Sequence, residues 1–100
     1  MKIIWSPTSR KKIEEIIDYI SAGNIDAALA LVEEFERRVA DLKKYPRSGR
    51  MVPILNDEMV RELIIRKDYL IVYEIQREHI TVLTIRHAKQ DFDESDLDLK

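Results

Sequence analysis

Cysteine is absent from this chain and histidine is nearly so, with His79 and His87 as the two examples. The lack of thiols excludes disulfides, cysteine nucleophiles and zinc sites built on cysteine. Two histidines are too few for another kind of metal site, so we expect no metal. The sequence also has no glycine-rich phosphate loop, no His-Glu-x-x-His pair and no serine nucleophile elbow. We therefore expect no cofactor, and no motif here is diagnostic of an enzyme.

Long hydrophobic runs are missing as well. No apolar stretch approaches the ~18 residues that a membrane span needs. The amino terminus reaches Ser6 and Pro7 too early to be a secretory signal. We expect a cytoplasmic protein with no membrane partner and no small-molecule substrate.

The length of 100 residues suits one domain with one modest core. Charged residues are plentiful but unevenly spread along it. The stretch from Arg37 to Arg50 is basic, with Asp41 as its only acid, whereas residues 91–100 are strongly acidic. Two interpretations are open. These are either two solvated surfaces, or the basic stretch is a face that meets an acidic partner or nucleic acid.

The first half of the chain has the pattern of one strand and two helices. Residues 2–5 are largely apolar and predict a short strand, after which Ser6-Pro7 is a typical helix start. Apolar residues then recur at helical spacing at Ile13, Ile16, Ile17 and Ile20. After a break at Gly23, a second helix begins near Asn24 and is stopped by Pro46. The two helices are expected to form an antiparallel hairpin.

The second half predicts a loop and three strands. The loop, residues 46–58, is long for so small a domain, as functional loops often are. The strands, joined by short turns typical of an antiparallel meander, are expected at 60–65, 69–76 and 79–86.

These elements predict an α+β fold of order β-α-α-β-β-β. A helical hairpin would pack on one face of a small, mainly antiparallel sheet and leave the other face as the natural working surface. We expect residues 1–90 to form this domain and residues 91–100 to be a mobile acidic tail.

Polar residues around the last strands are the candidates for chemistry. Arg61 lies near the start of the 60–65 strand, and Arg86 and His87 lie at the end of the last strand. Cations near a histidine can bind phosphate and transfer a proton, since histidine titrates near neutral pH. The structural alternatives are an ion pair of Arg61 with Glu62 or Glu74, and a His87 bonded to backbone.

Several short pieces occur in a fixed order along the chain. They are Trp5-Ser6, Tyr19-Ile20 before Gly23-Asn24, Ala27-Ala28, Leu42 with Pro46, Ser48-Gly49-Arg50, Val60-Arg61-Glu62-Leu63, Tyr69-Leu70-Ile71-Val72-Tyr73 and Ile85-Arg86-His87. None is specific alone. In this order and spacing, however, the chain resembles the ParE/RelE toxin superfamily, and within it the ParE-like toxins of plasmid stabilisation systems, over residues 2–90.

The resemblance implies the toxin of a type II toxin–antitoxin system, neutralised by a cognate antitoxin. Antitoxins of this superfamily wrap an extended or helical acidic segment around the toxin, which would suit the basic second helix and the loop after it. ParE-like members inhibit DNA gyrase and are not hydrolases. RelE-like members cut messenger RNA on the ribosome, using positive residues for the phosphate and acid–base help.

One departure bears on the choice between these targets. RelE-like nucleases have the motif Tyr-Arg-Leu-Val-Tyr, and this chain has Leu70 in place of the arginine that would stabilise charge on the scissile phosphate. Many ParE-like members also carry arginine there, so Leu70 argues against a nuclease without selecting gyrase. The Ser48-Gly49-Arg50 loop and the ending at His87 look more ParE-like.

We therefore favour a gyrase-directed toxin that acts by protein–protein binding. The alternatives are a ribosome-dependent endoribonuclease, with Arg61 and His87 as catalytic residues, and a decayed, non-toxic antitoxin-binding module. The residues expected to bind the antitoxin or the target are Arg37, Arg38, Lys43, Lys44, Arg47, Arg50, Arg86 and Lys89.

Overall fold

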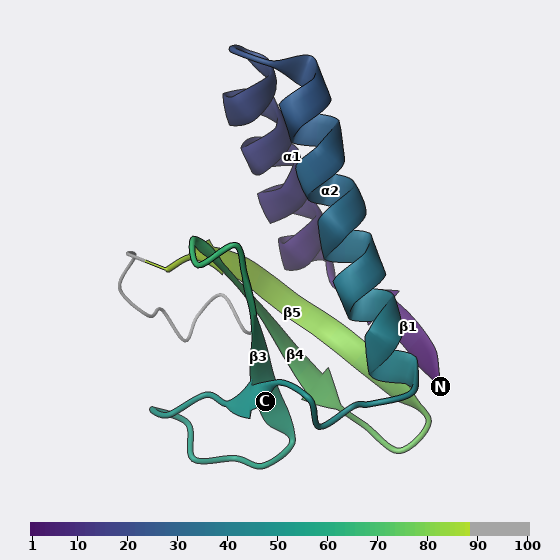
Figure 1. The fold of residues 1–100 in the computed structure, drawn as a ribbon. Coiled ribbons are helices and arrows are strands. Elements are labelled where there is room, and N and C mark those ends of the chain that lie inside the picture. Colours follow the sequence, from purple (N-terminus) through teal and green to yellow (C-terminus); the bar gives the residue numbers. More distant parts are fainter. Residues whose placement is uncertain (89–100) are drawn as a thin grey trace.

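The computed structural model describes residues 1–88, and Figure 1 shows two long helices lying on one side of a sheet. The elements follow in the order β1 (Lys2–Trp5), α1 (Pro7–Ser21), α2 (Ile25–Ala40), the 3-10 helix η1 (Asp41–Lys43), β2 (Arg50–Met51), β3 (Val60–Ile65), β4 (Tyr69–Ile75) and β5 (His79–His87). The predicted α+β class and element order are confirmed, with the short strand β2 added inside the predicted loop. Lys89 and the predicted tail, 91–100, lie outside the described residues.

Each helix begins at a side chain that caps it. The Ser6 hydroxyl accepts a hydrogen bond from the Ser9 N–H at 3.0 Å, and Pro7 occupies the first helical position. The Asn24 side chain accepts one from the Ala27 N–H, also at 3.0 Å. Both starts therefore lie where the sequence predicted them.

The second helix is shorter than predicted. It ends at Ala40 and not near Pro46, because the 3-10 helix η1 replaces its last turn. Leu42 lies in this turn and is fully buried, so the apolar spacing that predicted the helix continues beyond its end.

The strands have the order β1-β5-β4-β3-β2, so the first strand of the chain lies beside the last. β1 runs parallel to β5, with Ile3 opposite Ile80, and the other neighbouring pairs are antiparallel. A parallel pair needs a long crossover connection, of which the helical hairpin is a part. The sheet is mixed at one edge and antiparallel elsewhere.

A β-bulge corrects the alternation of side chains in β5. Val82 and Thr84 lie opposite consecutive residues of β4, which leaves Leu83 as the extra residue. Strict alternation would place Ile80 and Val82 on one face and Ile85 on the other. The extra residue returns Ile85 to the helical side, where all three join the main core.

The bulge is bound by the residue that starts α1. The Ser6 N–H donates to the Val82 carbonyl at 3.0 Å, and the Ser6 hydroxyl donates to the Leu83 carbonyl at 2.8 Å. One side chain therefore caps a helix and fixes the irregular part of a central strand.

The main core lies between the hairpin and the sheet, where the ring of Phe35 meets that of Tyr69 edge to face at 5.6 Å. A smaller apolar cluster lies on the other face of the sheet and is made of Val52, Val60, Val72 and Leu83, with Leu55 packed against it. The face that we expected to be an open working surface is therefore partly covered by the loop that follows β2.

Candidate functional site

Arg61, a candidate catalytic cation, is held by backbone carbonyls. It faces the helices, like its register partner Tyr73. Its Nε donates to the Glu58 carbonyl at 2.9 Å, and its Nη1 donates to the carbonyls of Gly49 at 2.8 Å and Arg47 at 3.4 Å. The guanidinium therefore joins the 46–58 loop to β3.

Glu62 lies on the opposite face, because adjacent residues of a strand point to opposite sides. Its side chain is fully buried. Its Oε2 accepts a hydrogen bond from Arg50 Nε at 2.7 Å, and Arg86 Nη2 lies 3.9 Å from its Oε1. A carboxylate buried this deeply is stable only when cations or donors balance it. We call these three residues the Glu62 cluster; in it, two of the predicted binding cations share one buried carboxylate.

Leu70 stands beside the Glu62 cluster, at the position where RelE-like nucleases have arginine. It is buried and pairs with Ile64 on one side and with Arg86 on the other. Thr84 on the same face is buried too, and its hydroxyl has no hydrogen-bond partner among residues 1–88. At this point the face offers apolar surface beside a cluster of two arginines and one buried carboxylate.

Tyr73 holds the same loop from the core side. It is fully buried, and its hydroxyl donates to the Pro46 carbonyl at 2.7 Å and accepts from the Gly49 N–H at 3.0 Å. Burial raises the pKa of Tyr73 above its ordinary value of 10.0, although the Gly49 N–H and the Arg61 charge lower it. A Cβ at Gly49 would lie 2.6 Å from this hydroxyl and 2.8 Å from the Glu62 carbonyl. The close approach explains why glycine occupies this position.

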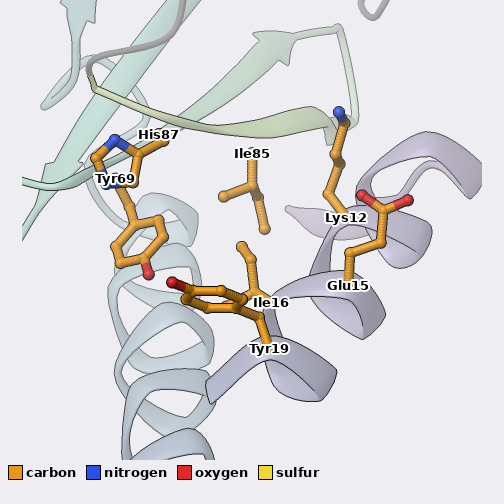
Figure 2. Close-up of a pocket in the computed structure, with 7 residues that line it drawn as sticks. All are labelled: Lys12, Glu15, Ile16, Tyr19, Tyr69, Ile85 and His87. Atoms are coloured by element: carbon orange, nitrogen blue, oxygen red, sulfur yellow. The ribbon is translucent and has the colours of Figure 1, made fainter. Parts of the chain in front are cut away.

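A pocket of about 340 Å³ lies between α1 and the end of β5, and Figure 2 shows the hydroxyl ends of Tyr19 and Tyr69 pointing toward one another in it. It is lined by Lys12, Glu15, Ile16, Tyr19, Tyr69, Ile85 and His87. The His87 ring meets the Tyr69 ring edge to face at 5.6 Å. Burial raises the pKa of Tyr69, as do Asp68 and Tyr19, whereas Arg66 lowers it. Tyr19 is 84% exposed, so an aromatic side chain stands in solvent at the rim of the pocket.

The structure does not bring Arg61 and His87 together. Both face the helices, but Arg61 pairs with Tyr73 on one side of β4, and His87 pairs with Tyr69 on the other. With strands about 4.8 Å apart and a rise of about 3.3 Å per residue, their Cα atoms are separated by roughly 16 Å. The side chains are also held by different partners, since the Arg61 guanidinium bonds carbonyls of the 46–58 loop and the His87 ring packs on Tyr69.

The predicted basic stretch is spread over α2, η1 and the loop after η1. Arg38 reaches across to β3, where its Nη1 donates to the Ile64 carbonyl at 3.4 Å. Arg47 pairs with Glu58 at 3.6 Å, and Arg50 belongs to the Glu62 cluster. The remaining cations of the stretch are exposed: Arg37, Lys43 and Lys44.

Sequence reasoning missed Glu62, Tyr73 and the pocket residues of α1. For Glu62 a signal existed, since an acid inside an apolar strand is expected to be buried and paired. Lys12, Glu15 and Tyr19 lie three and four residues apart on one flank of a helix, which the sequence also displays. No sequence signal links the Tyr73 hydroxyl to particular atoms of a loop.

Within residues 1–88, the histidine, aspartate and glutamate side chains form no group of three or more that could hold a metal ion. None of the helices there is both long and apolar enough to cross a bilayer.

The chain matches known proteins over most of its length. Residues 3–92 match the family described as ParE toxin of type II toxin-antitoxin system, parDE. Over 92 residues the chain is 34% identical to the protein named "Putative toxin Y4kP" from Sinorhizobium fredii (strain NBRC 101917 / NGR234), which covers 91% of this chain and 92% of that one. A chain of the solved chromosomal ParDE TA system from P. aeruginosa superposes with a TM-score of 0.73 at 20% identity, covering 89% of this chain and 97% of that chain.

The hairpin on a mixed five-stranded sheet is thus a fold shared with a chain of this solved system. The family match and the identity to the relative go further. This chain belongs to the ParE toxin family and is a ParE-type toxin of a type II toxin–antitoxin system.

Proposed function

We propose that this toxin acts in the cytoplasm by binding DNA gyrase, and that a cognate antitoxin neutralises it by binding its basic surface. The observation that carries the proposal is the state of the cations. Arg61 is bonded to three backbone carbonyls, and Arg50 and Arg86 are both paired with the buried carboxylate of Glu62. A toxin whose cations are engaged in this way is better suited to binding a protein than to stabilising a phosphate in a transition state.

The endoribonuclease alternative would need a different arrangement. Cleavage by the RNA 2′-hydroxyl requires a cation on the phosphate and an acid or base within reach of the reacting oxygens. Leu70 supplies neither. The Cα atoms of His87 and Arg61 are roughly 16 Å apart by strand geometry. His87 instead contacts Tyr69 at the rim of the pocket.

We propose the pocket between α1 and β5 as the gyrase contact. Two tyrosines line this cavity, and tyrosines are prominent among the residues that dominate binding energy at interfaces. Its apolar floor is made by Ile16 and Ile85, and Tyr19 stands exposed beside it. An apolar side chain of the partner could enter there and cover Tyr19.

The test is gyrase supercoiling of relaxed plasmid against rising amounts of the purified, antitoxin-free toxin. We expect inhibition together with trapped, cleaved DNA, and no cleavage of messenger RNA on ribosomes assayed in parallel. Messenger RNA cleavage without any effect on gyrase would overturn the proposal and favour the endoribonuclease. No effect in either assay would favour a decayed, antitoxin-binding module.

A pair of tyrosine variants tests the contact itself. Tyr19→Ala is expected to weaken inhibition by about tenfold or more, as truncation of an interface anchor does. Tyr45→Ala is the matched control, because Tyr45 is also exposed but lies outside the pocket. Equal inhibition by both variants would remove the pocket from the proposal.

Pairing of such a toxin with an antitoxin would also support plasmid stabilisation. The proposal predicts that cells losing a plasmid that carries both genes stop growing, because the remaining toxin inhibits their gyrase.

A further inference from the structure

The turn between β3 and β4 has a backbone conformation that its residue types rarely adopt. It runs from Ile65 to Asp68 and is closed by a hydrogen bond from the Asp68 N–H to the Ile65 carbonyl at 3.2 Å. Both central residues lie in the left-handed region, with a φ of 54° at Arg66 and of 66° at Lys67. Turns that need positive φ at both central positions are normally built from Asn-Gly or Asp-Gly, because a Cβ is unfavourable there. This turn has two long cationic side chains instead.

Arg66 has a partner in the fold that accounts for its presence. Its Nε forms an ion pair with Glu34 Oε1 on α2, which joins the turn to the helical hairpin. Residues 1–88 contain one further non-glycine residue with positive φ besides these two, Asn56, and asparagine tolerates the left-handed region. The conformations of Arg66 and Asn56 therefore have a structural explanation.

Lys67 has no such explanation within the described chain. It is exposed, and none of the ion pairs among residues 1–88 includes it. A glycine would adopt the same backbone conformation without strain. Strained residues cluster at binding and catalytic sites, where the strain is part of the function. Lys67 is therefore a candidate binding residue.

The turn lies at the same end of the sheet as the pocket between α1 and β5 (Figure 1). Tyr69, which lines the pocket, follows Lys67 by two residues and pairs with His87. The Ala88 N–H donates to the Asp68 carbonyl at 2.6 Å, so the turn is bonded to the end of β5. Two residues of chain span at most about 7 Å, a distance that an extended lysine side chain nearly covers. A segment that enters the pocket therefore passes within reach of Lys67.

We propose that Lys67 binds a carboxylate of the gyrase segment that enters this pocket. The segment is then recognised by two features. Its apolar side chain packs on the floor formed by Ile16 and Ile85, and its acidic residue pairs with the Lys67 ammonium group beside the pocket. This inference rests on the proposed function, in which the pocket contacts gyrase, and adds the chemistry of the partner segment.

A DNA phosphate is the other anion that a gyrase complex would offer to Lys67. The surroundings of the turn do not favour a polyanion. Arg66 is already paired with Glu34, Asp68 is the next residue of the turn, and Glu15 lines the pocket. The whole chain has a net charge of −2. Nucleic-acid backbones bind clustered cations, whereas one cation among carboxylates suits a single acidic side chain of a protein.

Calorimetric titration of gyrase, without DNA, with the purified full chain tests this contact. Lys67→Glu is expected to weaken binding about tenfold or more, because it places two like charges together. The matched control is Lys2→Glu, the same change at an exposed lysine that lies opposite His79, at the start of β5 and far from the pocket. We expect the control to weaken binding less than about twofold. Equal effects would mean general charge attraction and would overturn the inference.

The same titration with gyrase bound to a DNA duplex separates the two anions. A loss of affinity that appears only with DNA would assign Lys67 to a phosphate and would overturn the carboxylate contact. Wild-type affinity of Lys67→Glu would overturn this inference alone. A wild-type toxin that does not bind gyrase would overturn the proposed function and this inference together, so the two failures remain distinguishable.

Lys67→Gly tests whether the residue is retained for binding at the expense of the fold. Glycine removes the Cβ from a left-handed position, so we expect the thermal midpoint to rise by roughly 2–5 °C. The affinity for gyrase is expected to fall about fivefold, because the ammonium group is lost. A structural role alone would not move stability and affinity in opposite directions. A midpoint that falls or stays the same would mean that Lys67 serves the fold, and it would overturn the inference.

Discussion

The Glu62 side chain is fully buried, and two arginines pair with its carboxylate. We predict that Glu62→Gln lowers the free energy of unfolding by about 1–3 kcal/mol, since it removes the anion and leaves the arginines beside an uncharged amide. The matched control is Glu58→Gln, whose exposed carboxylate pairs with Arg47 at 3.6 Å and is expected to contribute less than about 1 kcal/mol. Urea denaturation of both variants provides the comparison. A Glu62→Gln protein as stable as the wild type would mean that the Glu62 cluster does not stabilise the fold.

The buried hydroxyl of Tyr73 makes stability depend on alkaline pH. Burial raises its pKa above 10.0 in the folded state, so folding favours the neutral phenol. The stabilisation is complete below the unfolded pKa of about 10 and is lost as the pH rises through the higher folded pKa. Tyr73→Phe removes this titration, so the stability advantage of the wild type over the variant should shrink between about pH 9 and about pH 11. Urea denaturation at several pH values measures this difference in the free energy of unfolding. A difference that stays constant with pH would contradict the assignment of the titration to Tyr73.

At the scale of elements, the two residues that cap the helices differ in the contacts they make. Asn24 only caps α2, on an exposed surface, whereas Ser6 caps α1 and also bonds the carbonyl at the β5 bulge. We predict that Asn24→Ala costs about 1 kcal/mol of stability and Ser6→Ala about 2 kcal/mol. Thermal and urea denaturation of the two variants give the values. Equal losses would mean that the contact to the bulge adds nothing to the cap.

Most elements could be predicted because their signals are local. The spacing of isoleucines predicted α1, and the capping residues Ser6 and Asn24 predicted both helix starts. β3 was predicted with its observed bounds, because apolar residues occupy both of its ends and turn residues follow it.

The features that could not be predicted depend on distant partners. β2 is two residues long and has no alternation that would identify a strand. The pairing of β1 with β5 joins the two ends of the described chain, and the bulge at Leu83 is visible only once the neighbouring strand is in register. The same limit applies to the site, where the alternation of faces separates Arg61 from Glu62 although they are adjacent in sequence.

At the scale of the whole molecule, the parallel contact of β1 with β5 makes the fold one cooperative unit. Trp5, the single tryptophan, lies on β1 and packs against the main core, so its fluorescence reports the docking of the first strand onto the last. Far-UV circular dichroism, by contrast, is dominated by α1 and α2. Because Ser6 bonds both the start of α1 and the β5 bulge, undocking of β1 should not precede loss of the helices. We predict that the two probes give superimposable urea transitions, with a free energy of unfolding of about 5–15 kcal/mol. In Ser6→Ala both curves should move together to lower urea; a fluorescence transition that moves alone would mean that β1 unfolds as a separate unit.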